Sequence, residues 1–255
     1  QDGPPIIDLS GDFRLPDADV YETWYGMEHR ALERLADAVF GLPELFRDDI
    51  RRARLVANPG CYPTATILAL APLLRRGLVR TDDIVVDAKS GVTGAGAHPK
   101  SGTHFPTVFG DLRAYGLLRH RHTPEIEAVL GRVADAEVHV LFTPHLLPVD
   151  RGILATCYAT PAGSLTADEV ATAYADDYAD EPFVRLTGAP PSVKEVRGSN
   201  FCDVHAELDP RTGRVLAMAA IDNLVKGAAG QAVQNLNLIF DRPETTGLTQ
   251  GPLTP

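Results

Sequence analysis

Several features that define large protein classes are missing from this sequence. It has only three cysteines in 255 residues, an odd number at wide spacing. This argues against a disulfide framework and predicts a reducing compartment, the cytoplasm. No CxxC or HxxxH pair is present, so no metal site is expected. No run of about 18 apolar residues occurs, so no membrane-spanning helix is expected either.

Positive charge is also scarce. The chain has 24 Lys and Arg against 34 Asp and Glu, a formal net charge of -10. Such a balance argues against a surface for nucleic acid or anionic membranes, although a local basic pocket can still bind an anionic small molecule. With 44% apolar residues the composition is that of an ordinary globular protein, and the length allows one large domain or two modest ones.

The most informative stretch is a predicted strand–turn–helix unit that carries a cysteine. Residues 54–57 predict a short strand and the apolar run 65–70 predicts a helix. They are joined by the turn Asn58-Pro59-Gly60-Cys61-Tyr62-Pro63-Thr64, which places Cys61 in the first helical turn. A helix N-terminus stabilises a thiolate, so we expect Cys61 to have a lowered pKa and to act as a nucleophile in acyl chemistry. Cys157 and Cys202 lie in strand patterns and are predicted to be core residues.

A nucleophilic thiol normally works with a histidine, and the segment His120-Arg121-His122-Thr123-Pro124-Glu125 offers two. We expect both histidines in a loop, with Pro124 at the first position of the helix that follows. Glu125 is predicted either to orient His122 or to cap that helix. His145, at the end of a strand predicted near 137–142, is a second candidate.

The glycine loop 91–96, with the sequence Gly-Val-Thr-Gly-Ala-Gly, follows a predicted strand at 83–88. It is not a dinucleotide-binding fingerprint, because further loop follows it in place of a helix. With Lys89, Ser90 and Thr93 it is suited to place backbone donors near an anion or a flat cofactor ring, and a plain flexible turn is the alternative. Arg113, Arg119 and Arg121 cluster around the histidines, where they are suited to bind carboxylate or phosphate groups.

Strand and helix patterns alternate along the rest of the chain and predict an α/β (α+β) fold with a mixed, partly antiparallel sheet. A buried strand opens the chain near residues 5–9, and residues 214–221 form a hairpin with 201–207. Helices are predicted at 166–178, with a capping box, and at 223–240, and the tail from Arg242 is predicted to be irregular. Further strands are expected at 152–159 and 193–196.

Together these segments resemble the N-acetyl-γ-glutamyl-phosphate reductase family, which is related to aspartate-semialdehyde dehydrogenase. The matching stretches span nearly the whole chain in order. They are Leu9-Ser10-Gly11-Asp12-Phe13-Arg14, the turn 58–64, Ser90 with the glycine loop, 120–125, 144–152 and Lys226-Gly227-Ala228-Ala229-Gly230-Gln231-Ala232.

The resemblance implies an NADPH-dependent reductive dephosphorylation of N-acetyl-γ-glutamyl phosphate in arginine biosynthesis. The Cys61 thiolate would form a thioester, His122 would be the acid/base partner, and N–H groups at the start of the Cys61 helix would stabilise the oxyanion. The residues implied for substrate binding are Ser90, Arg113, His120, Glu125 and His145. Those implied for NADPH or NADP are Gly91, Gly94, Asn223, Lys226 and Gly227. The family also implies a homo-oligomer, a dimer or tetramer, with the sheet around residues 193–221 as its surface.

One departure from the family pattern concerns the nucleotide-binding unit, whose glycine-rich loop after the first strand is not found here. We therefore expect residues 1–57 to be a remnant of that unit, 58–221 to form the catalytic and oligomerisation domain, and 222–255 to return to the first unit. The chain is then either a fragment or is completed by another polypeptide, and alone it should bind NADPH weakly and be nearly inactive. Two alternatives stay open: a cysteine hydrolase or acyltransferase, and a non-enzymatic assembly subunit.

Overall fold

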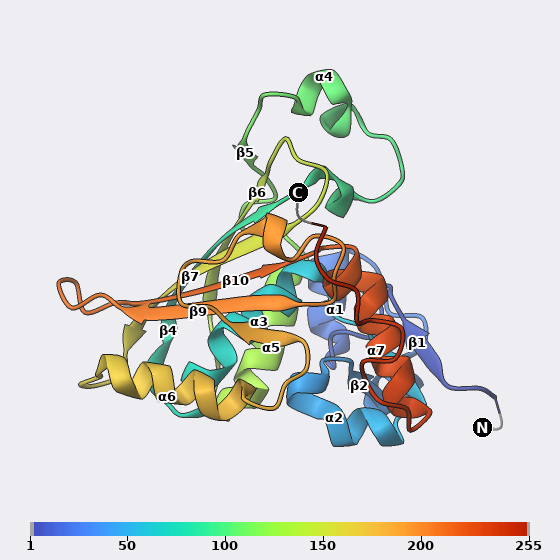
Figure 1. The fold of residues 1–255 in the computed structure, drawn as a ribbon. Coiled ribbons are helices and arrows are strands. Elements are labelled where there is room, and N and C mark those ends of the chain that lie inside the picture. Colours follow the sequence, from blue (N-terminus) through green and yellow to red (C-terminus); the bar gives the residue numbers. More distant parts are fainter. Residues whose placement is uncertain (1–2, 254–255) are drawn as a thin grey trace.

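The computed structural model describes residues 3–253, which contain two sheets (Figure 1). The smaller sheet is parallel and has the strand order β1-β3-β2. Its strands are β1 (Ile6–Asp8), β2 (Ala38–Phe40) and β3 (Leu55–Ala57), and its connections hold helices α1 (Ala18–Tyr25) and α2 (Pro43–Arg52) and the 3-10 helix η1 (Leu32–Asp37). The prediction of a buried opening strand was wrong, because β1 is an edge strand and Ile6 is 45% exposed.

The larger sheet has seven strands in the order β5-β6-β4-β7-β10-β9-β8. Its pairs β4–β6 and β8–β9 are parallel and the others antiparallel, which confirms the predicted mixed sheet and the β9–β10 hairpin. The strands are β4 (Val79–Ser90), β5 (Arg113–Ala114), β6 (Val140–Leu146), β7 (Ile153–Pro161), β8 (Val184–Leu186), β9 (Cys202–Leu208) and β10 (Val215–Ile221).

The strand predicted at 193–196 was wrong. This segment is the 3-10 helix η4 (Val193–Glu195), and β8 occupies the sheet edge instead. The Ser192 hydroxyl accepts the N–H of Lys194, a local side-chain-to-backbone bond that favours a turn over an extended strand.

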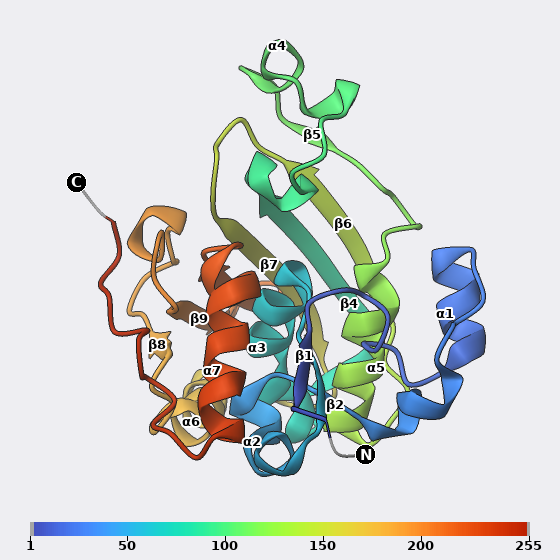
Figure 2. The same ribbon diagram turned by 90° about the vertical axis from the view of Figure 1, so that its right-hand side faces the viewer.

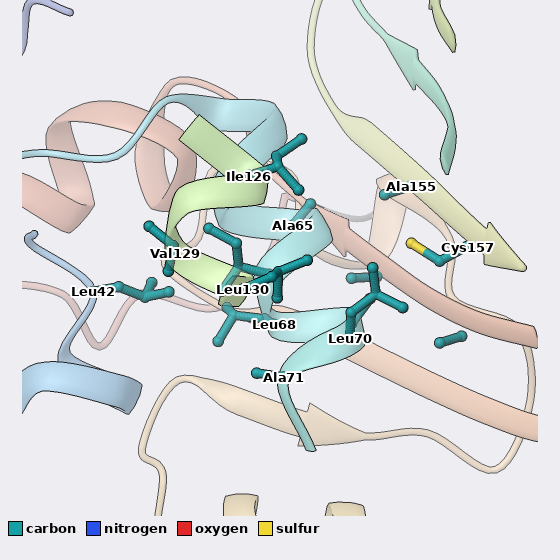
Figure 3. Packing of buried hydrophobic residues seen from close by; sticks show 14 of the residues in the cluster. Leu42, Ala65, Leu68, Leu70, Ala71, Ile126, Val129, Leu130, Ala155 and Cys157 are labelled. Carbon is teal, nitrogen blue, oxygen red and sulfur yellow. The ribbon is translucent and has the colours of Figure 1, made fainter. Parts of the chain in front are cut away.

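Three helices cover one face of the larger sheet, and in Figure 1 they lie beneath its strands. They are α3 (Cys61–Arg75), α5 (His122–Ala134) and α6 (Ala167–Tyr178). Helix α3 is apolar on all sides and is buried from Tyr62 to Leu74, because it packs against the sheet, α5 and α6. Its Ala65 and Leu68 lie beside Leu130 of α5, and Cys157 of β7 joins the same core (Figure 3). Cys157 and Cys202 are fully buried, as predicted.

A side-chain cap fixes the start of α6. Thr166 and Glu169 form the predicted capping box of α6. Helix α5 begins at His122, two residues before Pro124, so the prediction that His122 lies in a loop was wrong. The helix predicted at 223–240 is a π-helical turn η5 (Val225–Ala229) that continues into α7 (Gly230–Ile239). The tail after Asp241 holds turns and no regular element as far as residue 253.

Between β4 and α5 the chain leaves the body of the molecule. The 3-10 helix η2 (Val92–Ala95) is followed by an extension with the 3-10 helix η3 (Ser101–Thr103) and the short helix α4 (Phe105–Val108). Figures 1 and 2 show this extension projecting beyond the ends of β4 and β6. It returns through β5, which pairs with β6 at the sheet edge.

Candidate active site

The turn between β3 and α3 is held by two charged side chains from distant parts of the sequence. The Gly60 N–H donates to Glu125 Oε1 at 2.7 Å, and Arg14 Nε donates to the Asn58 carbonyl at 2.8 Å. Arg14 Nη1 also lies 3.6 Å from Glu125 Oε2. Gly60 is therefore fixed as the residue before the helix, and Cys61 is the first residue of α3, as predicted.

Two glycines allow close packing around this cysteine. A Cβ placed on Gly60 would lie 2.4 Å from His122 Nε2, and one on Gly227 would lie 2.7 Å from Cys61 Cβ. Neither distance is possible for a side-chain carbon, so His122 packs directly on Gly60, and the π turn η5 packs directly on Cys61. A π turn of this kind is often found at functional sites.

The Cys61 thiol is half-buried. Burial raises the pKa of Cys61 to about 11, and the N–H of Tyr62 and the charge of Arg14 offset only part of that rise. The prediction of a lowered pKa was therefore wrong for this state, because removal from water outweighs the helix N-terminus. The thiol is protonated at neutral pH.

His122, which packs on Gly60 next to Cys61, is the candidate acceptor for that proton. Burial and the neighbouring His120 and Arg14 lower the pKa of His122 well below its usual value, so the imidazole is neutral. Its Nδ1 has no hydrogen-bond partner within residues 3–253. Glu125 was predicted either to orient His122 or to cap its own helix, and neither role is seen. Its carboxylate accepts the Gly60 N–H instead and so holds the turn before Cys61.

His120 lies in an aromatic pocket beside His122. Its ring centroid is 5.6 Å from those of Tyr62 and Tyr115 and 5.3 Å from that of Phe142. Burial and Arg121 lower the pKa of His120 to about 4. Its Nδ1 accepts the N–H of His122 at 3.2 Å, so the neutral ring carries its proton on Nε2 and is a donor there.

A cavity of about 660 Å³ opens beside these histidines. Its lining contains His120 and His122 and no aspartate or glutamate, although the chain is acidic overall. It contains five basic residues: Arg14, Lys100, Arg113, Arg119 and Arg121. An anion is the ligand that such a lining favours.

The structure brings four more of the predicted residues to this cavity and leaves others outside it. Ser90, Gly91, Gly94 and Arg113 belong to the lining. Arg113 also donates to the Gly102 carbonyl at 2.5 Å and to Asp111 at 2.8 Å. His145 is not in the lining, and its Nδ1 lies 3.1 Å from Asp87 Oδ1.

Three predicted cofactor residues lie behind the cavity wall. Asn223 accepts the Gly152 N–H at 2.8 Å and donates to Thr93 Oγ1 at 2.9 Å, so it ties the glycine loop to the sheet. Gly227 packs on Cys61. Lys226 is fully buried, and its Nζ donates to Glu44 Oε1 at 2.6 Å and to Gln234 Oε1 at 2.8 Å. The Lys226 ammonium therefore does not face the cavity.

Sequence reasoning missed Arg14, Lys100 and Tyr25 as lining residues. Arg14 ends the segment 9–14, which the family resemblance includes, so that segment was the available signal. Nothing local marks Lys100 or Tyr25, because both reach the cavity through tertiary folding. Arg121 Cζ lies 5.1 Å from the centre of the Tyr25 ring, a cation–π contact that fixes the guanidinium at the rim.

The glycine loop is tightly packed and carries few side chains. A Cβ on Gly91 would lie 2.7 Å from the Asp150 carbonyl oxygen, so the loop is packed tightly on the β6–β7 connection. Together with the Asn223–Thr93 bond, this packing makes a fixed edge with few side chains, which suits a planar ring.

In the part of the chain from residue 3 to residue 253, no group of three or more metal-binding side chains is found. No helix in that part is both long and apolar enough to cross a membrane.

Comparison with known proteins agrees with this geometry. The family model for the semialdehyde dehydrogenase dimerisation domain matches residues 61–223. Aspartate semialdehyde dehydrogenase II of Vibrio cholerae superposes with a TM-score of 0.64 at 18% identity, over 81% of this chain and 69% of that one. The Francisella tularensis enzyme gives 0.64 at 15% identity, over 82% of this chain and 72% of that one. The fold is therefore of the semialdehyde dehydrogenase class.

Curated relatives define the family more narrowly. The N-acetyl-gamma-glutamyl-phosphate reductase of Pelotomaculum thermopropionicum is 55% identical over 255 residues, which are 99% of this chain and 74% of that protein. The protein of the same name from Symbiobacterium thermophilum is 54% identical over 257 residues, with the same coverage of both. This chain belongs to the N-acetyl-gamma-glutamyl-phosphate reductase family.

The raised pKa of Cys61 predicts the pH dependence of its reactivity. A thiol is protonated below its pKa, and only the thiolate reacts with iodoacetamide. The alkylation rate should therefore rise about tenfold per pH unit from pH 7 and level off near the value of about 11. Peptide mapping of labelled Cys61 against pH measures this, with Cys61→Ser as the control for labelling elsewhere. A plateau already near pH 7 would contradict the account.

Proposed function

We propose that this chain reduces N-acetyl-γ-glutamyl phosphate to N-acetylglutamate 5-semialdehyde and phosphate, with NADPH as the reductant and Cys61 as the covalent nucleophile. One observation carries the proposal. Cys61 begins α3 one residue after the glycine on which His122 packs, and His122 in turn lines a cavity whose charged lining residues are all basic, although Cys61 itself is not among the lining residues. The curated relatives carry the name of this reaction.

The basic lining provides the substrate site. An acyl phosphate with a free carboxylate brings at least two negative groups, and Arg119 and Arg121 supply guanidinium groups that can bind them in bidentate fashion. Arg14 adds positive charge, but its guanidinium is already held by the Asn58 and Leu9 carbonyls and by Glu125. His120 supplies a neutral donor from Nε2. Arg113 is held by the Gly102 carbonyl and Asp111, so we assign it chiefly to shaping the wall.

Acylation begins with the Cys61 thiol and the His122 imidazole both uncharged. As the sulfur of Cys61 attacks the acyl carbon, its proton passes to His122, whose neutral imidazole is the base. The new bond joins sulfur and carbon, and the bond from carbon to the phosphate oxygen breaks, so phosphate leaves and a thioester remains. The N–H groups of Cys61 and Tyr62 lie at the start of α3 and are suited to stabilise the oxyanion.

The second half of the reaction uses the glycine loop. When bound, NADPH supplies the hydride that reduces the thioester to the aldehyde. The loop with Gly91 and Gly94 lines the same cavity as His122 and offers a flat edge for the ring. His122 then returns its proton to the sulfur as the aldehyde leaves, which restores the neutral pair.

The open face of the larger sheet is the surface we propose for a homo-oligomer, a dimer or a tetramer. The face opposite α3, α5 and α6 carries half-exposed side chains of β4, β7 and β10, among them Val85, Tyr158 and Met218. The match to a dimerisation domain covers all three strands. The surface is therefore broader than the predicted stretch 193–221.

The test of the proposed function is stoichiometry. With N-acetyl-γ-glutamyl phosphate and saturating NADPH, the low turnover expected of this chain alone should oxidise one NADPH for each phosphate released, with one equivalent of aldehyde formed. Phosphate release without NADPH oxidation, to give N-acetylglutamate, would identify a cysteine hydrolase instead.

Replacing the base should slow acylation. We expect His122→Asn to lower the rate of phosphate release in a single turnover by roughly 100-fold, because the proton of Cys61 then has no acceptor. His139→Asn is the matched control, since His139 is exposed and does not belong to the cavity lining. An unchanged rate in the His122 variant would remove this residue from its role.

A further inference from the structure

The guanidinium of Arg121 differs from those of two other arginines in the cavity lining. Arg14 and Arg113 already donate to carbonyl or carboxylate oxygens of the protein. Arg121 is exposed at the rim, and within residues 3–253 its guanidinium contacts the ring of Tyr25 and makes no hydrogen bond or ion pair. Its N–H groups are therefore free to bind an anion in the cavity.

The contact with Tyr25 fixes Arg121 without occupying those donors. Arg121 Cζ lies 5.1 Å from the centre of the Tyr25 ring. The ring of Tyr21 stacks on Tyr25 with centroids 4.4 Å apart and an interplanar angle of 8°, so the guanidinium lies over the other face of Tyr25. A cation on the face of an aromatic ring is held by the ring's quadrupole, and the N–H groups at its edges stay available.

The stack of Tyr21 and Tyr25 is itself anchored in the body of the molecule. Both residues belong to α1, which lies beside α5 (Figure 2). Tyr21 is 3% exposed, and its hydroxyl donates to Asp12 Oδ1 at 2.9 Å. The ring of His29 meets that of Tyr21 edge-on at 4.9 Å. His29 Nδ1 accepts the Ala31 N–H, so its Nε2 carries the proton and donates to the Asp12 carbonyl at 2.8 Å. The platform under Arg121 is therefore rigid.

The charge of Arg121 acts close to the proposed base. Next to burial, it is a cause of the lowered pKa of His120, and it also contributes to the lowered pKa of His122. His122 packs on Gly60, directly before Cys61, so an acyl carbon attacked by the sulfur lies near this histidine. In an acyl phosphate the phosphoryl group is joined to that carbon through a single oxygen, whereas the carboxylate lies at the far end of the carbon chain. The anion nearest to His122 is therefore the phosphoryl group.

We propose that Arg121 binds the phosphoryl group of the substrate and that Tyr25 is the positioning residue that holds Arg121 in place. The inference rests on the proposed function, and it assigns the leaving-group end of the substrate to one side chain. When the carbon–oxygen bond breaks, its electron pair stays with the phosphate, and Arg121 stabilises the added negative charge. Because the guanidinium is fixed before the substrate binds, little side-chain entropy is lost on binding.

Binding of inorganic phosphate tests the platform without cofactor or turnover. In a ³¹P NMR titration, Tyr25→Leu should raise the dissociation constant of phosphate about 3- to 10-fold, because it removes the ring under Arg121. Tyr25→Phe keeps the ring and should stay within about twofold of the parent. Equal affinities in the parent and in Tyr25→Leu, or a parent that binds no phosphate, would overturn the inference.

The matched control breaks a second cation–π contact that lies outside the cavity. Arg132 Cζ lies 4.3 Å from the centre of the Phe46 ring, and neither residue belongs to the cavity lining. Phe46→Leu should leave the phosphate affinity unchanged, with circular dichroism confirming that all variants fold. A loss as large as that of Tyr25→Leu would show that the effect is not local to Arg121 and would overturn the inference.

A second probe separates the phosphoryl group from the carboxylate. N-acetylnorvaline carries the carboxylate of the substrate and no phosphoryl group, so Tyr25→Leu should bind it as the parent does. A loss of affinity for N-acetylnorvaline in place of phosphate would assign Arg121 to the carboxylate and overturn the proposal.

Acylation by two donors separates this inference from the proposed function. The γ-p-nitrophenyl ester of N-acetylglutamate can acylate Cys61 without a phosphoryl group, so its single-turnover rate should be the same in the parent and in Tyr25→Leu. With N-acetyl-γ-glutamyl phosphate, the variant should need about 3- to 10-fold more substrate for half-maximal rate. Equal losses with both donors would mean general damage to the site and would overturn the role of Tyr25. A parent that binds phosphate but is acylated by neither donor would overturn the proposed function.

Discussion

Replacing Glu44 by glutamine is expected to destabilise the protein by about 3–5 kcal/mol. Glu44 on α2 and Lys226 in the π turn are both fully buried at their side chains, with Nζ and Oε1 2.6 Å apart. The glutamine leaves the Lys226 ammonium without a countercharge and away from water, which is among the most costly single changes a core can undergo. Urea unfolding followed by circular dichroism measures the loss.

Two variants make this test specific. The double change Glu44→Met/Lys226→Met removes both charges and should recover most of the lost stability, because well-packed apolar residues often replace a buried pair at little cost. Asp82→Asn removes a carboxylate from the exposed Arg80–Asp82 pair and should leave the unfolding midpoint unchanged. A Glu44→Gln variant as stable as the parent would show that the buried pair does not hold the π turn.

The second large effect concerns the nucleophile. Cys61→Ser should lower single-turnover phosphate release by roughly 10³-fold or more, because a serine hydroxyl at this position is a far poorer nucleophile. Stability should change little, since the side chain keeps its size beside Gly227 and the thiol carries no charge at neutral pH.

The matched control is Cys157→Ser, which alters a buried core cysteine away from the cavity lining. It should reduce stability and leave the rate per folded molecule unchanged. Wild-type rates in Cys61→Ser would exclude a covalent route through this sulfur.

Local patterns predicted the parts of the site that depend on neighbours in the sequence. The β3–α3 turn, the capping box at Thr166 and the β9–β10 hairpin follow from residues within a few positions of one another. The residue pattern already offered the histidine pair and the glycine loop, and the family resemblance then assigned the acid/base role to His122; His122 and the loop do share one cavity.

Long-range partners explain the errors. Lys226 is paired with a residue 182 positions away, so its sequence context gave no sign that it is buried. Glu125 bonds to Gly60, 65 positions away, instead of its own helix or His122. The pKa of Cys61 was misjudged for the same reason, because a helix N-terminus is a local feature, whereas the burial that outweighs it depends on the whole fold. The three-residue strand β2 was missed because so short a segment carries no periodicity, whereas α2 was missed although its buried Phe46 and Ile50 repeat at helical spacing.

The central claim is that one sulfur atom carries the acyl group between the two half-reactions. Intact-mass spectrometry after brief mixing with N-acetyl-γ-glutamyl phosphate, without cofactor, tests it most directly. The account predicts a mass gain of one N-acetylglutamyl group, mapped to Cys61, released by hydroxylamine and absent from Cys61→Ser. An unmodified protein that still releases phosphate, or the same adduct in Cys61→Ser, would contradict it.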